Sequence, residues 1–453
     1  MFIDTHAHLF FENFSDDIDE VINRAKENGV DYIIVPATDL ATSKESIELA
    51  EKYEMIYATV GIHPHDTKEW NDSLLLEIEK LTKHPKVVAI GEIGLDYYYD
   101  FSPKEQQIKA FKSQLDLANK LELPVVIHNR DSDVDMMEII QSYCGTGLKA
   151  QFHCFNGSLA DALEFMKMNH FISFTGNITF KKSDGLREIL KHIDLNHLML
   201  ETDSPFMTPI PYRGKRNEPA HVKIVAEKIS EIHNLSIKEV GRITSLNTFR
   251  FFGIGSAPET SFTYLLDNSL YINVTNRCNA DCTFCRRKED PFLRGYNLGM
   301  KKSEEPTADV YIKEIGDPKK YDEIVFCGYG EPTIRWDVVR EVAKYVKANG
   351  GKTRINTNGH GNIINKKDIT PGMKDTIDVV SISFNSFDSK QYAELMRVSE
   401  DHFDEMKNFA RLAKPNVKKV VMSVVSLDEV EIEKSRKVVE DEIGVEFRVR
   451  KYF

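Results

Sequence analysis

Histidines and carboxylates follow several short apolar runs in the first half of this chain. His6 and His8 belong to the string Asp-Thr-His-Ala-His at 4–8, and on a strand their side chains share one face because residues i and i+2 point the same way. Further imidazoles and carboxylates follow four more runs, at Glu92, His128, His153 and Asp203. Imidazole nitrogens and carboxylate oxygens bind divalent ions such as Mg²⁺, Mn²⁺ and Zn²⁺. These residues predict a convergent metal site, with ordinary buried polar residues as the alternative.

The apolar runs themselves predict the elements that bring these residues together. Eight runs have the length of buried parallel strands, and amphipathic helical segments separate them. The runs are 2–4, 32–35, 56–60, 87–90, 125–127, 150–152, 171–174 and 198–200. Eight strand–helix pairs in about 250 residues are typical of a TIM-type (β/α)8 barrel, whose active site lies at the carboxyl ends of the strands. We expect residues 1–253 to form such a barrel.

Five strings in this half resemble the TatD family of metal-dependent hydrolases. They are Phe-Ile-Asp-Thr-His-Ala-His at 2–8, Gly-Ile-His-Pro-His at 61–65, Gly-Glu-Ile-Gly-Leu-Asp-Tyr at 91–97, Phe-His-Cys-Phe at 152–155 and Glu-Thr-Asp-Ser-Pro at 201–205. The resemblance implies two divalent ions. The implied ligands are His6, His8, Glu92 and Asp203 for one ion, and Glu92, His128 and His153 for the other. It follows that Glu92 would bridge the ions, while Asp203 would position a water molecule or accept its proton.

The substrate of this half follows from the same resemblance. The resemblance implies nuclease-like hydrolysis of DNA, so a nucleic acid or nucleotide is the expected substrate. Related barrels also cleave esters and amides, and such a substrate remains the alternative. Weaker candidates for substrate contacts are His63, Arg130 and Arg213. Guanidinium groups bind phosphate through charge-assisted hydrogen bonds, whereas a solvated basic loop would be the alternative for the two arginines.

Three closely spaced cysteines dominate the second half. Cys278, Cys282 and Cys285 form the pattern C-x3-C-x2-C directly after an apolar run. Three thiolates ligate three irons of a [4Fe–4S] cluster and leave the fourth iron open. A structural zinc site would need a fourth cysteine or histidine, and none follows at finger-like spacing. The pattern therefore predicts an iron–sulfur cluster.

This pattern is similar to that of the radical S-adenosylmethionine superfamily. Residues 262–453 of this chain resemble the core of that superfamily. The resemblance implies that S-adenosylmethionine binds the open iron and is cleaved to a 5′-deoxyadenosyl radical, with a reductant such as flavodoxin or ferredoxin. The implied cofactor contacts are Gly328, Gly330, Glu331, Asn356, Ser383 and Asn385. Polar caps on strand ends are the alternative for the last three of these residues. Apolar runs at 270–274, 323–326, 353–356, 379–383, 419–425 and 446–450 predict a partial (β/α)6 barrel, and 254–261 reads as a linker.

Composition limits the remaining possibilities. Of the 59 Lys and Arg and 71 Asp and Glu residues, 27 and 39 lie in residues 1–253, so this half carries the whole net charge of −12 and the other half none. Neither half is basic enough to coat nucleic acid. The chain has no apolar stretch of membrane-spanning length and does not start like a signal peptide, which favours a cytoplasmic protein without membrane contact. Two enzymes in one chain are the favoured reading, and a non-catalytic recognition role for one barrel is the alternative.

Overall fold

The computed structural model describes residues 1–451 and divides the chain into two compact units. The first is Met1–Ala257, and the second begins at Pro258. The division falls inside the segment 254–261 that the sequence predicts as a linker. Among the described residues, no helix has both the length and the apolar character of a membrane span.

Eight parallel strands of the first unit form one sheet in the order of the sequence. They are β1 (Phe2–Asp4), β2 (Val30–Pro36), β3 (Ile56–Val60), β4 (Val87–Asp96), β5 (Val125–Arg130), β6 (Ala150–Phe152), β7 (Phe171–Phe174) and β8 (Leu198–Leu200). The amide of Thr5 donates to the carbonyl of Leu200 over 2.9 Å, and Ala7 bridges Ser204, so the ends of β1 and β8 close the sheet into a barrel. The predicted (β/α)8 barrel is confirmed.

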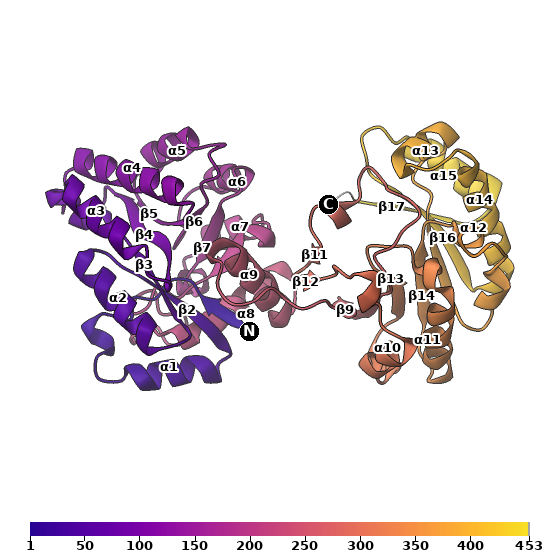
Figure 1. Cartoon of the computed structure of the whole chain (residues 1–453), viewed down its shortest axis with the longest axis horizontal. Helices are drawn as coiled ribbons and strands as arrows, with labels where there is room; N and C mark the ends of the chain where they lie inside the picture. Colours follow the sequence, from indigo (N-terminus) through magenta and orange to yellow (C-terminus); the bar gives the residue numbers. More distant parts are fainter. Residues whose placement is uncertain (452–453) are drawn as a thin grey trace. The chain divides into compact units, whose positions relative to one another are not determined.

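Helices surround this barrel (Figure 1). They are α1 (Ile18–Glu27), α2 (Leu40–Lys52), α3 (Asp72–Leu81), α4 (Lys104–Leu121), α5 (Asp133–Ser142), α6 (Leu159–Lys167), α7 (Asp184–Leu190), α8 (Val222–His233) and α9 (Ile237–Phe252). Strand side chains such as Val88, Val126 and Phe171 form an apolar cluster with Phe251 and Phe252 at the end of α9. These apolar side chains come from the amino-terminal parts of their strands, so polar groups are left to gather at the carboxyl ends.

The second unit contains an open sheet in the order β17-β16-β15-β14-β13-β10-β9. Its strands are β9 (Thr263–Leu266), β10 (Ser269–Asn273), β13 (Ile324–Cys327), β14 (Thr353–Thr357), β15 (Val379–Ser383), β16 (Lys419–Val425) and β17 (Glu446–Arg450). Six strands are parallel, as the partial barrel requires, and β9 pairs antiparallel with β10 at one edge. A separate two-stranded ladder joins β11 (Phe292–Leu293) and β12 (Tyr296–Asn297).

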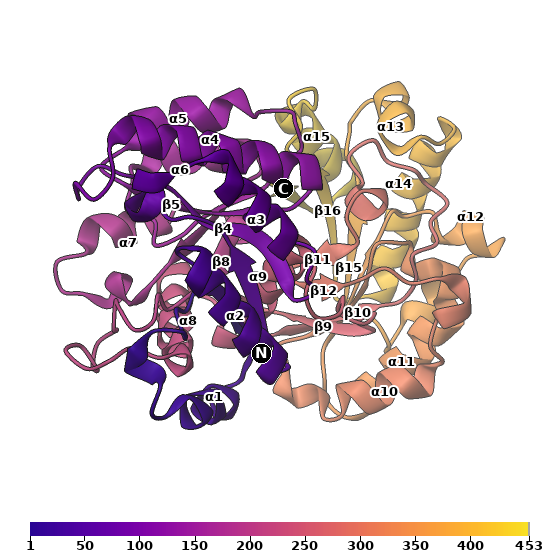
Figure 2. The same ribbon diagram turned by 60° about the vertical axis from the view of Figure 1, so that its left-hand side comes forward.

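The two faces of this second sheet differ in polarity. Ile355, Ile382 and Met422 belong to the apolar core that the strands share with the helices. Alternate positions on β14 and β15, such as Arg354 and Ser383, point to the opposite face because strand side chains alternate. Helices α10, α11, α12 and α14 lie together against one side of the sheet (Figures 1 and 2). The helices are α10 (Ala308–Ile315), α11 (Trp336–Ala348), α12 (Gly361–Asn365), α13 (Ser389–Met396), α14 (Asp401–Ala413) and α15 (Ile432–Lys437).

Candidate metal centre and cysteine loop

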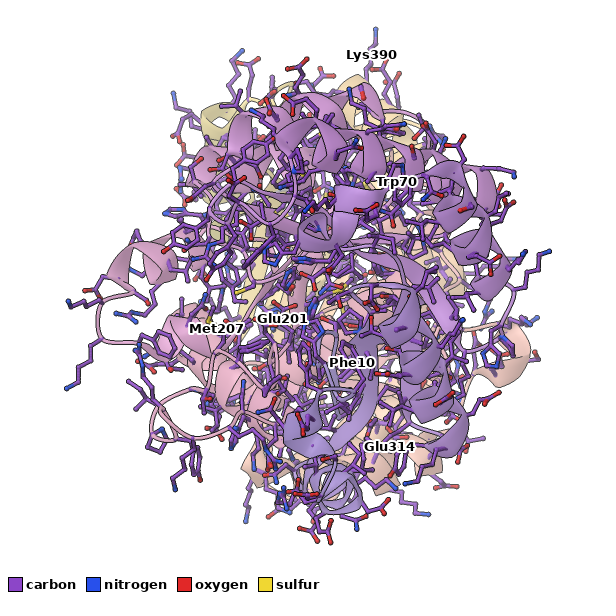
Figure 3. The ribbon with its side chains drawn as sticks, turned by 90° about the vertical axis from the view of Figure 1, so that its left-hand side faces the viewer. Phe10, Trp70, Glu201, Met207, Glu314 and Lys390 are labelled. Carbon is purple, nitrogen blue, oxygen red and sulfur yellow. The ribbon has the colours of Figure 1, made fainter. Side chains whose placement is uncertain are left out.

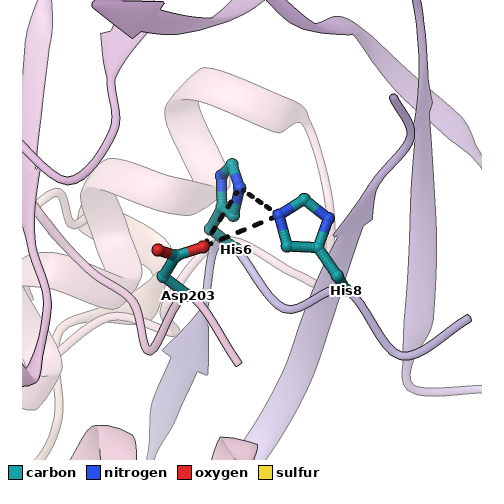
Figure 4. A group of neighbouring side chains, drawn as sticks. All are labelled: His6, His8 and Asp203. Atoms are coloured by element: carbon teal, nitrogen blue, oxygen red, sulfur yellow. Dashed lines mark hydrogen bonds and ion pairs between the residues drawn. The ribbon is translucent and has the colours of Figure 1, made fainter. Parts of the chain in front are cut away.

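The two histidines after β1 meet two carboxylates that lie far from them in the sequence, Glu92 and Asp203. Nε2 of His6 and Nε2 of His8 lie 3.4 and 3.6 Å from Oε2 of Glu92. The same two nitrogens lie 3.9 and 3.6 Å from Oδ1 of Asp203. Figure 4 shows His6, His8 and Asp203 pointing toward one another. Two imidazoles and two carboxylates therefore surround one point in space.

Glu92 faces a second group of histidines through its other oxygen. Oε1 of Glu92 lies 2.7 Å from Nε2 of His153 and 3.0 Å from Nδ1 of His128. Nε2 of His63 lies 3.4 Å from the same oxygen. The two oxygens of this carboxylate thus face two different sets of nitrogen atoms, and the side chain is only 3 % exposed.

Glycines let β4 bring Glu92 so close to its neighbours. Gly94 adopts φ of +145°, and a Cβ atom there would lie 1.9 Å from the carbonyl oxygen of His128. A Cβ atom on Gly91 would lie 2.7 Å from Cβ of Val126. Only glycine permits this approach of β4 to β5, and the approach sets His128 beside Glu92.

The electrostatics of the cluster suit a cation. Burial lowers the pKa of His6 to about 3 and that of His63 to about 4, so both rings are neutral and offer lone pairs. Burial also opposes a charge on His153, but the Glu92 carboxylate outweighs it and raises the pKa of His153 to about 9. Nε2 of His6 and Nε2 of His8 lie only 3.1 Å apart. A positive charge among these groups is favourable, so the donor set fits divalent metal ions.

Asp96 at the end of β4 orients two of the rings. Its Oδ2 lies 3.0 Å from Nε2 of His128 and 2.8 Å from Nε2 of His65. Its Oδ1 accepts the amides of Tyr98 and Tyr99 over 3.0 and 3.1 Å. A proton on Nε2 of His128, directed at Asp96, would leave Nδ1 as the free nitrogen that faces Glu92. Despite burial, hydrogen bonds from His128, Tyr99 and His65 hold the pKa of Asp96 below its usual range.

Two further buried carboxylates support the site, and the sequence analysis did not select them. Asp4 accepts hydrogen bonds from the amide and hydroxyl of Thr202 over 2.9 and 2.6 Å, which ties the end of β1 to the end of β8. Glu201 accepts the amide of Cys154 and lies 4.0 Å from Nδ1 of His153. Burial raises the pKa of Glu201 to about 7. Asp4 and Glu201 both lie within strings that carry the family resemblance, and this is the feature of the sequence that could have identified them. Figure 3 labels Glu201 near the middle of its view.

Most of the metal-facing groups and two of the three weaker sequence candidates line one cavity of about 870 Å³. His63 and Arg130 line it. His63 also lies among the metal-facing nitrogens, whereas the sequence favours a structural or substrate-contacting role for it over a ligand role. The guanidinium of Arg213 stacks 3.9 Å above the ring of Phe180, which is itself part of the cavity lining.

The cysteine loop of the second unit follows β10. Cys278, Cys282 and Cys285 are all free and partly buried. Burial raises the pKa of Cys282 to about 12, and charges on Cys278 and Cys285 contribute, so the three sulfur atoms lie within electrostatic reach of one another. Three neighbouring thiolates repel one another, and a cationic iron–sulfur cluster would offset this repulsion. The three cysteines therefore fit such a cluster.

The turn after β13 packs directly beneath this loop. A Cβ atom on Gly330 would lie 2.3 Å from the carbonyl oxygens of Thr275 and Arg277. Glu331 is 2 % exposed and accepts the hydroxyl of Thr357 and the amide of Asn358, each over 2.7 Å. This carboxylate therefore ties the end of β13 to the end of β14.

The other predicted cofactor contacts stand at neighbouring strand ends. Gly328 adopts φ of +108° at the end of β13. Asn356 donates to the sulfur of Cys327 over 3.5 Å, and Ser383 accepts a hydrogen bond from Arg450 over 3.2 Å. Oδ1 of Asn385 is buried and has no hydrogen-bond partner among the described residues. These residues gather at or just after the carboxyl ends of β13, β14 and β15. Their contacts with a cofactor stay predictions.

A parallel eight-stranded barrel with histidines and carboxylates at its strand ends defines a metal-dependent hydrolase. Residues 3–253 match the model of the TatD related DNase family, which is more than half of the chain, and the chain belongs to that family. Residues 272–439 match the Radical SAM superfamily, so the second unit is a radical SAM domain. Both are families of enzymes, and they imply divalent metal ions, an iron–sulfur cluster and S-adenosylmethionine.

Known relatives resemble the barrel. "Uncharacterized metal-dependent hydrolase YabD" of Bacillus subtilis is 44% identical over 254 residues, which span 56% of this chain and 100% of the relative. "3'-5' ssDNA/RNA exonuclease TatD" of Erwinia amylovora is 32% identical over 257 residues, 55% of this chain and 99% of the relative. The crystal structure of the TatD homologue YJJV from Escherichia coli K12 is 32% identical, with a TM-score of 0.54, and the match covers 56% of this chain and 98% of that one.

Proposed function

We propose that the first unit hydrolyses phosphodiester bonds in nucleic acid with two divalent metal ions. Mg²⁺, Mn²⁺ and Zn²⁺ all suit the mixed donor set. His6, His8, Glu92 and Asp203 would hold one ion, and Glu92, His128 and His153 the other. The observation that carries this proposal is the division of the Glu92 oxygens, Oε2 toward His6 and His8, and Oε1 toward His128 and His153.

The protein groups around the site have separate roles in this reaction. Bound divalent ions lower the pKa of water and neutralise a phosphodiester. Asp203 is ionised because His8 and His6 lower its pKa against the effect of burial, and it can orient the attacking water or accept its proton. Nδ1 of His8 lies 3.1 Å from the carbonyl oxygen of Pro36, which keeps the ring turned with Nε2 toward the carboxylates. Arg130 at the cavity wall supplies a cation for the substrate phosphate.

Nucleic acid is the preferred substrate class for two reasons. One relative carries the name of an exonuclease of single-stranded DNA and RNA. Arg130 and Arg213 also place guanidinium groups at or beside the cavity, where they suit an anionic substrate. An ester or amide substrate is the second candidate, because metal-activated water attacks those bonds too.

The test compares the metal-loaded wild type with Glu92→Gln on a single-stranded oligonucleotide and on nitrophenyl acetate. We expect cleavage of the oligonucleotide by the wild type only, and less than two metal equivalents in Glu92→Gln. Glu188→Gln, which alters an exposed carboxylate paired with Lys191, is the matched control. Two retained metal equivalents with full activity in Glu92→Gln would contradict the bridging role, and hydrolysis of the acetate alone would favour the second candidate.

We propose that the second unit binds a [4Fe–4S] cluster through Cys278, Cys282 and Cys285. When bound, such a cluster would supply the electron for cleavage of S-adenosylmethionine to methionine and a 5′-deoxyadenosyl radical. Gly330 allows the turn after β13 to approach the cysteine loop. Oδ1 of Asn385 is buried without a hydrogen-bond partner among the described residues, so it is available to accept a hydrogen bond from the cofactor. A low-potential protein such as flavodoxin or ferredoxin would reduce the cluster. Clustered free cysteines favour the reducing environment of the cytoplasm.

Anaerobic reconstitution tests this assignment. The wild type should bind four irons and release 5′-deoxyadenosine when a reductant and S-adenosylmethionine are added. Cys282→Ala should lose the cluster, whereas Cys327→Ala should keep it, because three thiolates and the cofactor saturate the four irons. A cluster that persists in Cys282→Ala, or one zinc ion in place of iron, would overturn the assignment. If both units prove active, we infer that they serve one pathway; activity of one unit alone would favour a recognition role for the other.

A further inference from the structure

Exposed aromatic side chains border the mouth of the hydrolase cavity. Tyr98 is 58% exposed, Phe101 57% and Phe206 53%. Tyr98 and Phe206 line the cavity itself, together with Tyr99 and Phe11. Large aromatic side chains gain free energy by leaving water, so several of them gathered at the rim of one cavity mark a binding surface.

The first aromatic group, the Tyr98 cluster, consists of Tyr98, Tyr99 and Phe101 on the segment after β4, together with Arg130 at the end of β5. The guanidinium of Arg130 lies 3.8 Å above the Tyr98 ring and 4.9 Å above the Tyr99 ring. The rings of Tyr99 and Phe101 are stacked, with centroids 5.2 Å apart and planes at 22°. The cluster therefore offers flat faces and a delocalised cation.

The backbone beneath the Tyr98 cluster is held in place by the metal site. Asp96, which orients the ring of His128, accepts the amides of Tyr98 and Tyr99. His65 bonds to the same carboxylate, and its ring lies 4.8 Å from that of Phe101. The position of the aromatic faces is thus set relative to the metal ligands before any substrate binds.

The second group, the Phe206 cluster, consists of Phe10, Phe11 and Phe206 on the segments after β1 and β8. The rings of Phe11 and Phe206 are 5.8 Å apart, and those of Phe10 and Phe11 are 4.7 Å apart. His8 lies beside them, 5.3 Å from Phe11 and 6.5 Å from Phe206. Figure 3 labels Phe10 and Met207, the residue after Phe206, on either side of Glu201.

The two clusters stand on opposite sides of the site. The strands follow one another around the barrel in sequence order, so β1 and β8 lie across the barrel from β4 and β5. Each cluster also adjoins a different metal-facing set: the Phe206 cluster adjoins His8, and the Tyr98 cluster adjoins His128 through Asp96. A substrate whose phosphate lies at the metal site would extend toward both clusters.

We propose that the Tyr98 and Phe206 clusters are stacking surfaces for the nucleobases on either side of the scissile phosphodiester. This inference rests on the phosphodiesterase function proposed above. Aromatic rings stack on any base, and a guanidinium group can stack on the other face of the same aromatic ring. Bases inside a duplex already stack on each other, so only an unpaired strand can use both surfaces. Such a strand would present one base to each surface, on either side of the cleaved bond.

The test compares two oligomers with the same phosphodiester backbone, one of ten thymidines and one of ten abasic residues. For the metal-loaded wild type we expect the value of kcat/KM to be higher for the thymidine oligomer. Tyr98→Ala and Phe206→Ala should each lower the thymidine-to-abasic ratio of kcat/KM by about 5- to 150-fold, the size of one lost base–aromatic stack. Leu76→Ala removes a side chain that is 57% exposed on α3, outside the cavity lining, and should leave the ratio unchanged.

The outcomes separate the stacking surfaces from the underlying function. Equal cleavage of both oligomers by the wild type, or an unchanged ratio in both alanine variants, would overturn the stacking surfaces alone. Cleavage of neither oligomer would overturn the phosphodiesterase assignment and the stacking surfaces with it. A strand containing 2-aminopurine gives a second readout: stacking should quench its fluorescence on the wild type, and Tyr98→Ala should restore it.

Discussion

Asp96 is the residue whose replacement tests the arrangement of the metal site most sharply. Its two oxygens serve two sets of donors, the backbone amides of Tyr98 and Tyr99 on one side and the rings of His65 and His128 on the other. In Asp96→Asn only one oxygen remains as an acceptor. Whichever way the new amide turns, its NH2 group faces one of the two donor sets.

The expected damage is to the metal rather than to the fold. If the amide NH2 faces His128, Nε2 of that ring must accept, and the ring proton moves to Nδ1, the nitrogen that lies 3.0 Å from Glu92. That nitrogen can then no longer bind a metal ion. Loss of such a supporting carboxylate typically weakens metal binding by about 10- to 100-fold, or about 1.4–2.8 kcal/mol.

Metal titration of the purified protein measures this effect. We expect one of two metal equivalents to bind about 10- to 100-fold more weakly in Asp96→Asn, with a parallel loss of phosphodiesterase activity. Asp135→Asn is the matched control, because Asp135 also accepts from a tyrosine and pairs with Lys104 but lies on α5. Two tightly bound equivalents and full activity in Asp96→Asn would refute the claim that Asp96 orients His128.

Three other predictions concern the second unit and its boundary. Burial opposes ionisation of Asp378, but Lys347 and Lys418 lower its pKa from 3.8 to about 2, so its carboxylate stabilises the fold above pH 4. About 2 kcal/mol should be lost as the pH falls from about 5 to below 2, and urea unfolding of Asp378→Asn should lack that loss. Gly330→Ala should lower iron content on reconstitution, because a Cβ atom there would clash with the cysteine loop; full iron content would contradict this. Fragments 1–257 and 258–453 should each unfold cooperatively, and an insoluble pair would refute the boundary.

Much of this protein could be predicted from the sequence because the relevant signals are local. Buried parallel strands are short apolar runs, so seven of the eight barrel strands are predicted to within three residues at each end. β4 instead continues six residues beyond the predicted run 87–90, to Asp96. A residue that ends a barrel strand must lie at the active-site end, so His6 and Asp203 could be brought together on paper although 197 positions separate them. The spacing of three cysteines within eight residues is likewise a property of the chain alone.

Only the tertiary structure decided which neighbours these residues meet. β9 is a short strand at a sheet edge, and its antiparallel pairing with β10 leaves little periodic signal in four residues. The double role of Asp96 depends on how β5 and the segment after β3 approach it, and a sequence does not show such an approach. The Tyr98 and Phe206 clusters gather residues from four strand ends around one cavity. The proposed stacking surfaces depend on long-range packing, because the closed barrel brings rings from distant parts of the sequence to one cavity.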